Sequence, residues 1–128
     1  MGGWNRAGVA KAIAALLADL DESVTVFDAP PSTLNPPAYV VRYPSVVDYD
    51  VPTFGVDLGT LPVEAIVAPG EFDRLDAMLD DARQALSDDD NLGGAVVTQS
   101  PRSQSGWRMF NVAGVDVMAA QLILEIRM

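Results

Sequence analysis

The sequence predicts an α+β protein in which a mostly antiparallel sheet of about five to six strands carries two helices on one face. Two segments have apolar residues at spacings of three and four, which predicts helices near the start of the chain and over 71–86. Several short runs rich in β-branched residues predict strands, and the connections between neighbouring runs are too short for helical crossovers. The expected order of elements is α-β-β-β-α-β-β-β.

The length and composition of the chain are those of one soluble domain. With 128 residues, 49% of them apolar and 20% charged, we expect residues 1–128 to form a single domain. No stretch approaches the roughly 18 to 20 uninterrupted apolar residues of a membrane helix, so no membrane association is expected. The opening MGGWNRAGVAKAIAALLADLDE lacks a signal-peptide cleavage pattern. We expect the protein to be made and kept in a cytosol.

The first elements are a helix and a short strand. The helix is predicted over about residues 4–20, because an apolar stripe runs through Val9, Ile13, Leu16, Leu17 and Leu20. The β-branched run SVTVFD at 23–28 predicts a strand. Two Pro-Pro pairs in 29–37 exclude a helix or a central strand there, because proline lacks the amide donor. This connection is either a stiff loop, which we favour, or a docking segment.

Two further strands are predicted over 38–43 (AYVVRY) and 61–68 (LPVEAIVA). Between them, 44–59 lacks a regular pattern and predicts a long loop that carries Tyr49 and Phe54 among acidic residues. Exposed aromatic residues in a long loop are typical of a partner surface. The alternative, that both aromatic residues cover the edge of the core, has equal weight.

The second helix is predicted over 71–86, with a core-facing stripe at Phe72, Leu75, Leu79, Ala82 and Leu86. Acids in its first turn suit the positive end of the helix dipole, whereas Asp88–Asp90 indicate that the helix has ended. A strand over 95–100 and a flexible loop tip over 100–106 are expected to follow.

The last part of the chain predicts a β-hairpin. Ala113-Gly114 forms the expected two-residue turn between strands 106–112 and 115–128. The last strand alternates, with Met118, Ala120, Leu122, Leu124, Ile126 and Met128 on its buried face. Its other face is only half polar, which indicates a subunit interface and therefore an oligomer.

The residue types present argue against catalysis and cofactor binding. Cysteine and histidine are absent, which excludes disulfides, thiol nucleophiles, zinc sites with the usual ligands and serine–histidine triads. No pair of carboxylates has a spacing that indicates acid–base catalysis, and the Asp88–Asn91 run lacks the ligand spacing of a calcium loop. We therefore predict no catalytic, cofactor or metal site and no enzymatic activity.

The net charge of −10 weighs against free binding to nucleic acid, which requires clustered Lys and Arg. Between Glu71 and Asp90 there are eight acids and only two arginines. These acids are either the solvated face of the second helix, which we favour, or an acidic surface that repels DNA or meets a basic protein.

The order of several segments resembles the tail terminator proteins of long, non-contractile-tailed bacteriophages. The likeness is carried by VAKAIAALLADL, VTVFDAPPSTLNPPAYVV, DYDVPTFGVD, FDRLDAMLDDARQAL, Leu92-Gly93-Gly94 and the terminal GVDVMAAQLILEIRM. It spans nearly the whole chain and depends on the order and spacing of these segments. It implies a subunit of a homo-oligomeric ring, a hexamer, in the virion.

According to this resemblance the ring lies at the head-proximal end of the tail tube. It ends polymerisation of the tail tube protein and provides the joint to the head-completion or connector protein. DNA passes through the lumen without specific binding, and no cofactor or membrane is involved. The subunit is made in the host bacterial cytoplasm.

Five residues are the predicted interface candidates: Tyr49, Phe54, Arg102, Trp107 and Arg108. Trp, Tyr and Arg are the side chains that most often carry interface energy. For Trp107 a core position is an equally weighted alternative. Two other functions stay open, namely a head-completion (neck) ring protein and, with less support, an acidic inhibitor that mimics DNA.

Overall fold

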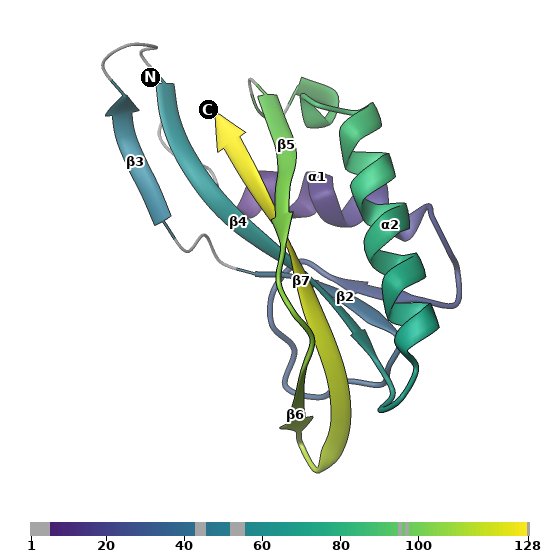
Figure 1. Cartoon of the computed structure of the whole chain (residues 1–128). Helices are drawn as coiled ribbons and strands as arrows, with labels where there is room; N and C mark the ends of the chain where they lie inside the picture. The colour runs from purple at the N-terminus through teal and green to yellow at the C-terminus, as the bar shows by residue number, and fades with distance from the viewer. Residues whose placement is uncertain (1–5, 43–45, 52–55, 95, 97, 128) are drawn as a thin grey trace.

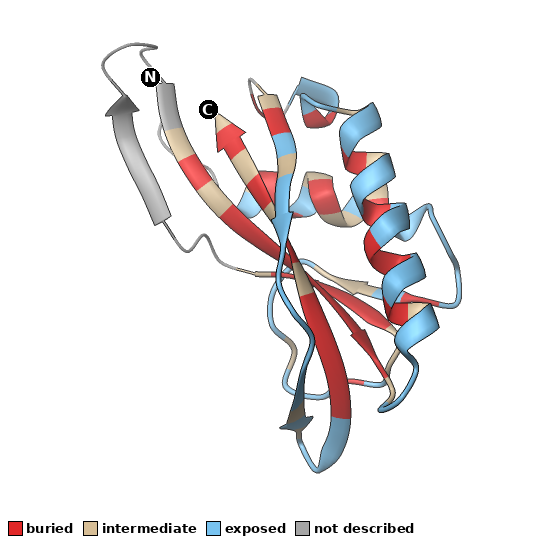
Figure 2. Cartoon of the chain, viewed as in Figure 1, coloured by how far each residue is buried: buried red, intermediate tan, exposed pale blue. Residues whose placement is uncertain are grey.

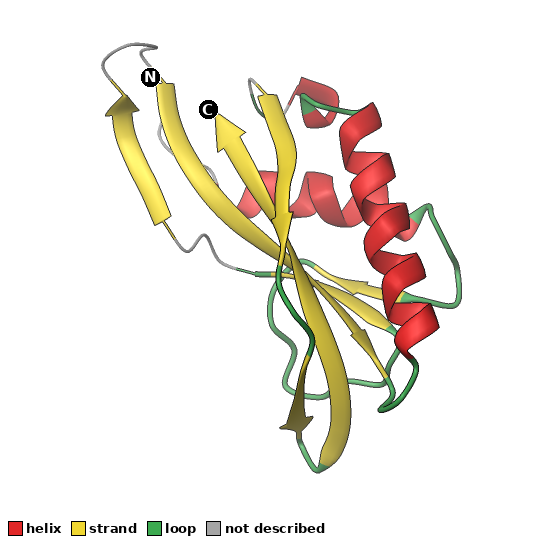
Figure 3. Cartoon of the chain, viewed as in Figure 1, coloured by secondary structure: helices red, strands yellow, loops and turns green. Residues whose placement is uncertain are grey.

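The computed structural model describes residues 6–42, 46–51, 56–94, 96 and 98–127, with the backbone alone at 6, 46–51 and 56–57. A seven-stranded sheet carries two helices against one face (Figures 1 and 3). The helices are α1 (Arg6–Ala18), α2 (Phe72–Asp88) and the short 3-10 helix η1 (Leu92–Gly94). The strands are β1 (Thr25–Phe27), β2 (Ala38–Val41), β3 (Val46–Val51), β4 (Val56–Val67), β5 (Thr98–Gln104), β6 (Arg108–Val112) and β7 (Val115–Arg127). The predicted α+β class, with a mostly antiparallel sheet, is confirmed.

The two longest strands, β4 and β7, form the centre of the sheet. They pair antiparallel from Leu58↔Arg127 to Val67↔Met118. Along the outer edge of β4 lie β3 and β2, one after the other, and β1 adds to β2 as the parallel strand of the sheet. Along the outer edge of β7 lie β5 and β6, also one after the other (Figure 1). Every other described strand is therefore attached, directly or through β2, to the central pair.

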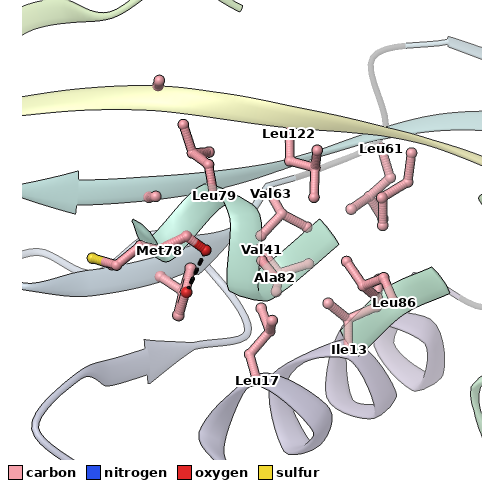
Figure 4. Close-up of a cluster of buried hydrophobic side chains, with 14 of the residues drawn as sticks. Ile13, Leu17, Val41, Leu61, Val63, Met78, Leu79, Ala82, Leu86 and Leu122 are labelled. Atoms are coloured by element: carbon pink, nitrogen blue, oxygen red, sulfur yellow. Dashed lines mark hydrogen bonds between the residues drawn. The ribbon is translucent and has the colours of Figure 1, made fainter. Parts of the chain in front are cut away.

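The main core lies between the central strands and both helices. The residues of β7 predicted to face inward, from Met118 to Ile126, are buried in it. Opposite them are the buried stripes of the helices, as Figures 2 and 4 show. These stripes consist of Val9, Ala10, Ile13 and Leu17 in α1 and of Leu75, Met78, Leu79, Ala82 and Leu86 in α2. Replacing any one of the large members by alanine is expected to cost about 2–5 kcal/mol.

A smaller apolar cluster covers part of the opposite face of the sheet, which we call the second face. Its buried members are Leu34, Ala38, Val40, Ile66, Val117 and Ala119. Leu34 comes from the proline-rich connection 29–37, so this loop folds across the second face. The half-polar face predicted from the sequence is thus partly covered by the chain itself.

The segment 44–59, expected to be a loop, contains β3 and the beginning of β4. The two strands pair through Val46↔Thr60 and Asp48↔Leu58, with a register shift before Val51↔Val56. Valines at 46, 47, 51 and 56 supply the β-branched residues that favour strands. The Asp, Pro and Gly residues between them are uncommon in strands, so the segment shows no clear strand pattern in the sequence. The expectation of a loop here is wrong for these residues.

The segment 100–106, expected to be a loop tip, is largely strand. Residues 98–104 pair with β7, with a bulge between Pro101 and Ser103. Proline is tolerated because β5 is an edge strand. Gln99 is buried in β5, and its side-chain amide donates to the carbonyls of Leu86 and Asp89 at the end of α2. It therefore satisfies helix-end carbonyls that a glycine cap commonly serves.

The terminal hairpin has the predicted two-residue turn. Val112 pairs with Val115, and the intervening Ala113 and Gly114 have φ angles of 51° and 87°. Asn111 stabilises the turn, because its side-chain oxygen accepts a hydrogen bond from the Gly114 amide at 2.9 Å. This geometry suits glycine at 114 but places a Cβ-bearing residue at 113 in the left-handed region.

We predict that Ala113→Asn stabilises the protein, because asparagine tolerates the left-handed conformation better than alanine. The expected gain is about 0.5–1 kcal/mol in the free energy of unfolding, measured by urea denaturation. The matched variant Gly114→Ala should have the opposite effect. A loss of stability in Ala113→Asn would contradict the turn geometry.

Tyr39 joins β2 to α2, since its hydroxyl donates to the Met78 carbonyl at 2.7 Å. Burial, with smaller contributions from Asp81 and Asp21, raises the pKa of Tyr39 above its ordinary value of 10.0. The folded state therefore favours the neutral phenol. Stability from this group is present below the ordinary pKa and is lost as the pH rises above it.

We predict that Tyr39→Phe lowers the free energy of unfolding by about 0.5–1.5 kcal/mol near neutral pH. The difference from the parent protein should shrink between pH ~8 and pH ~10.5, because only the parent loses the contribution of the neutral phenol. Urea denaturation at both pH values measures the effect. A constant difference would show that ionisation of Tyr39 is not coupled to folding.

Candidate interface site

A pocket of about 300 Å³ opens on the second face of the sheet, and we call it the second-face pocket. The loop 29–37 forms one side, and β2, β4 and β6 form the rest. Its lining is mainly apolar, with two arginines: Pro30, Pro31, Leu34, Val40, Ile66, Phe110, Val112, Arg42 and Arg108. The pocket exists because the loop covers only part of the second apolar cluster.

A buried carboxylate holds the two arginines in place. Glu64 in β4 is fully buried, and its side chain points to the second face as that of Ile66 does. Arg42, at the end of β2, forms an ion pair with it and donates from Nε at 3.1 Å. Arg108 donates from Nη2 at 3.2 Å, and Gln121 donates from Nε2 at 3.4 Å. We call these four residues the Glu64 cluster.

The Glu64 cluster leaves positive charge at the surface. Its anion is buried, whereas the side chains of Arg42 and Arg108 are 28% and 58% exposed. One carboxylate faces two guanidinium groups, so one positive charge is not balanced within the cluster. The guanidinium carbon of Arg108 also lies 4.6 Å from the centre of the Phe110 ring, a cation–π distance. The pocket therefore combines apolar walls with a cationic side.

On the helix side of the sheet, next to the beginning of β6, two exposed aromatic rings lie against each other. The centroids of Phe72 and Trp107 are 5.2 Å apart with an interplanar angle of 80°. Such edge-to-face contacts stabilise by about 0.5–1.5 kcal/mol beyond area burial. The two residues are 45% and 54% exposed, and Met109, two residues after Trp107, is 49% exposed. We call Phe72 and Trp107 the aromatic pair.

The expectation that Phe72 belongs to the core stripe of α2 is wrong. Phe72 is the first residue of the helix, and the buried stripe begins one turn later at Leu75. Helical spacing places Phe72 on the correct side of the helix, but at this end its ring contacts Trp107 of the edge strand region instead of the core. Helical periodicity shows which side of a helix is apolar, but it does not show at which residue the contact with the core begins.

The acids of α2 lie on its solvated side. Glu71, Asp73, Asp76, Asp80 and Asp81 are exposed, as is the outer face of the helix in Figure 2. Asp80 accepts a hydrogen bond from Arg83 at 3.0 Å in an exposed pair, which contributes little to stability. Three of these acids, Glu71, Asp73 and Asp76, are within four residues of Phe72 and surround it with negative charge.

Of the five predicted interface residues, the structure describes the side chains of three, and it does not bring these three into contact with one another. Trp107 is exposed, so the core alternative for it is wrong, and Arg108 follows it with its side chain on the second face. Arg102 lies in β5, 62% exposed, with Glu125 at 3.9 Å. For Tyr49 only the backbone in β3 is described, and Phe54 lies outside the described residues. Contact of these residues with a partner stays a prediction.

Sequence reasoning missed the Glu64 cluster. The available signal was Glu64 itself, the one charged residue in the otherwise apolar strand LPVEAIVA. A charge in a strand of this kind requires a partner, but the partners come from β2, β6 and β7. Their identities follow from strand pairing, which the pattern of one strand does not contain.

Within the described residues, no group of three or more Asp, Glu, His or Cys side chains is placed to hold a metal ion. In the same part of the chain, no helix has the length and apolar character needed to cross a membrane.

Comparison with known proteins finds a likeness to solved structures and none to family models or curated sequences. No protein-family model matches the chain, and no curated protein sequence matches it. A chain in the structure described as the virion of a native gene transfer agent (GTA) particle is similar, with a TM-score of 0.47 and 17% sequence identity. The similarity covers 98% of each chain. At these values the likeness assigns no function to the present chain.

We predict that Glu64→Gln lowers the free energy of unfolding by about 1–3 kcal/mol, because both arginines lose their buried anion. The matched control is Glu125→Gln in β7, whose partners Arg102 and Arg127 are at 3.9 and 3.6 Å in a more exposed setting. This control should cost less than about 1 kcal/mol. Urea denaturation measures both, and equal losses would contradict a structural role of the Glu64 cluster.

Proposed function

We propose that the chain is a virion structural subunit that assembles with copies of itself into a ring at the head-proximal end of a phage tail tube. In this role the ring ends polymerisation of the tube protein and provides the joint to the head-completion proteins. The resemblance of the sequence to tail terminator proteins supports this proposal, and six copies are the number that it suggests. The proposed role is structural and includes no catalysis.

The observation that carries the proposal is that two unlike exposed features lie on opposite faces of the sheet, and we propose both as contact surfaces. The aromatic pair is on the helix side, and the second-face pocket is on the other side. A ring built head to tail needs two unlike surfaces on each subunit, whereas a two-fold dimer needs one self-complementary surface. Exposed aromatic residues beside charged groups are typical of such contacts.

The acidic character of the chain suits a ring through which DNA passes. The net charge is −10, and the exposed side of α2 carries several of the acids. A surface of the same sign as the phosphate backbone does not retain DNA, so the polymer moves past it without specific binding. We propose that part of this acidic surface faces the lumen.

The proposed role is tested by binding to growing tail tubes from the same phage. Because the chain has no cysteine, Ala15→Cys on the exposed side of α1 accepts a single gold label at a residue that belongs to neither proposed surface nor to the acidic side of α2. The labelled protein is mixed with polymerising tube protein and imaged by electron microscopy. We expect label at one end of each tube, with elongation halted there.

Other outcomes point to the alternatives. Label on DNA-filled heads but not on tubes would place the protein in the neck, as a head-completion ring. Label on neither would contradict a role in the virion and leave the DNA-mimic inhibitor as the hypothesis to pursue. Gold-labelled serum albumin, which is also acidic, serves as a control for non-specific adhesion.

A further inference from the structure

We propose that the second-face pocket of one copy receives the aromatic pair of a neighbouring copy. This inference rests on the proposed ring and names the two halves of its repeated contact. It commits to a second copy of the same chain as the occupant of the pocket. The grounds are size, charge and the direction in which the two surfaces point.

The pocket has the size and walls to accept side chains of a protein partner. Its volume of about 300 Å³ is at the low end for small-molecule sites, and its apolar walls are interrupted by Arg42 and Arg108. The aromatic pair is the complementary element, because aromatic rings supply the largest apolar area per residue. Both rings are about half exposed in the isolated subunit, so each has apolar area left to bury.

The charges of the two surfaces are opposite. In the pocket, buried Glu64 balances only one of the two lining arginines, so together these three residues carry one net positive charge although the chain as a whole is strongly negative. Around Phe72 the exposed acids Glu71 and Asp73 are next neighbours in sequence. Opposite charges across an interface accelerate association and determine which surfaces meet.

Further acids and one base surround Phe72. Asp76 lies one helical turn further along α2, on the same side as Phe72, and is exposed. Arg74 is the basic residue in this turn, and it donates to the Ser23 hydroxyl at 3.0 Å, so its charge points back toward the loop after α1. The surroundings of the aromatic pair are therefore negative on balance.

Arg108 gives the pocket a specific way to hold an aromatic ring. Its side chain is 58% exposed, and its guanidinium carbon lies over the Phe110 ring. In the proposed contact, the side of the guanidinium group opposite Phe110 receives a second ring, from Phe72 or Trp107 of the neighbour. A guanidinium group between two aromatic rings retains its bond to Glu64, because the donor Nη2 lies in the plane of the group.

The directions of the surfaces make the contact head to tail. Trp107 and Arg108 are consecutive residues, but Trp107 contacts α2 on the helix side whereas Arg108 contacts Glu64 on the second face. Each copy can therefore donate its aromatic pair to one neighbour and accept that of another. Repetition of such a contact yields a closed ring when the rotation between copies closes, and a filament when it does not.

The test uses cysteine cross-linking, which is clean because the chain has no cysteine of its own. Asp73→Cys marks the surface beside the aromatic pair, and Val112→Cys marks the pocket. The two single variants carry different affinity tags and are treated with a short bis-maleimide, separately and as a mixture. We expect cross-linked dimers in the mixture, each containing one copy of each variant, and little product from either variant alone.

The double variant Asp73→Cys/Val112→Cys should give a ladder of products that ends at the ring size. Products from either single variant alone would indicate a two-fold contact and overturn the proposal. Absence of cross-links in the mixture, at concentrations up to the solubility limit, would also overturn it. Circular dichroism of each variant verifies that the fold is retained.

A second measurement tests the aromatic anchor. Light scattering should show that Trp107→Ala weakens self-association by on the order of tenfold or more. The matched control is Leu20→Ser. It removes an exposed apolar residue that lies two positions after the end of α1 and belongs to neither surface. Equal behaviour of the two variants would contradict the proposal.

The two proposals fail in different ways. If gold label marks tube ends but the mixed variants do not cross-link there, the ring uses other surfaces and only the present inference is wrong. If the variants cross-link as expected but label appears on neither tubes nor heads, the head-to-tail contact stands and the proposed role in the tail is wrong.

Discussion

The pairing of β4 with β7 is the constraint on which the rest of the structure depends. Both strands are long, and their register runs without interruption from Leu58↔Arg127 to Val67↔Met118. Because side chains alternate across a strand, this register decides at once which residues face the helices and which face the pocket. A shift by one residue would turn Glu64 into the main core and expose Val63 and Ala65 on the second face. The hydrophobic core and the Glu64 cluster therefore depend on the same set of backbone hydrogen bonds.

The parts of the fold that the sequence predicts are those in which burial produces a regular pattern. The alternation from Met118 to Ile126 and the stripe from Leu75 to Leu86 predict their elements correctly, because each has one face in a continuous core. The predictions fail at the edges of the sheet. In β5 the side chains are mostly exposed, so the sequence has no alternation that would indicate a strand. Pro101 also argued against a strand, because proline is excluded from central strands, but an edge strand such as β5 tolerates it.

The candidate site was only partly predictable, because it is assembled from separate elements. The chemical types of Trp107 and Arg108 indicate interface residues, but nothing local shows that they point to opposite faces. The contact between Phe72 and Trp107 joins residues 35 positions apart in sequence, and that between Glu64 and Arg108 joins residues 44 apart. These contacts result from the attachment of β6 to β7 and of α2 to the sheet. Sequence reasoning therefore identified some members of the site but not the site itself.

The bulged edge formed by β5 and β6 has a consequence for how copies of this protein can meet. An unprotected edge strand offers a row of amide and carbonyl groups to which any other strand can add, irrespective of its side chains. Here Pro101 removes one donor, and the bulge before Ser103 breaks the spacing of the rest. Backbone pairing between copies is thus disfavoured along this side. Recognition along this side is left to side chains, so indiscriminate addition of strands is disfavoured here while specific contacts remain possible.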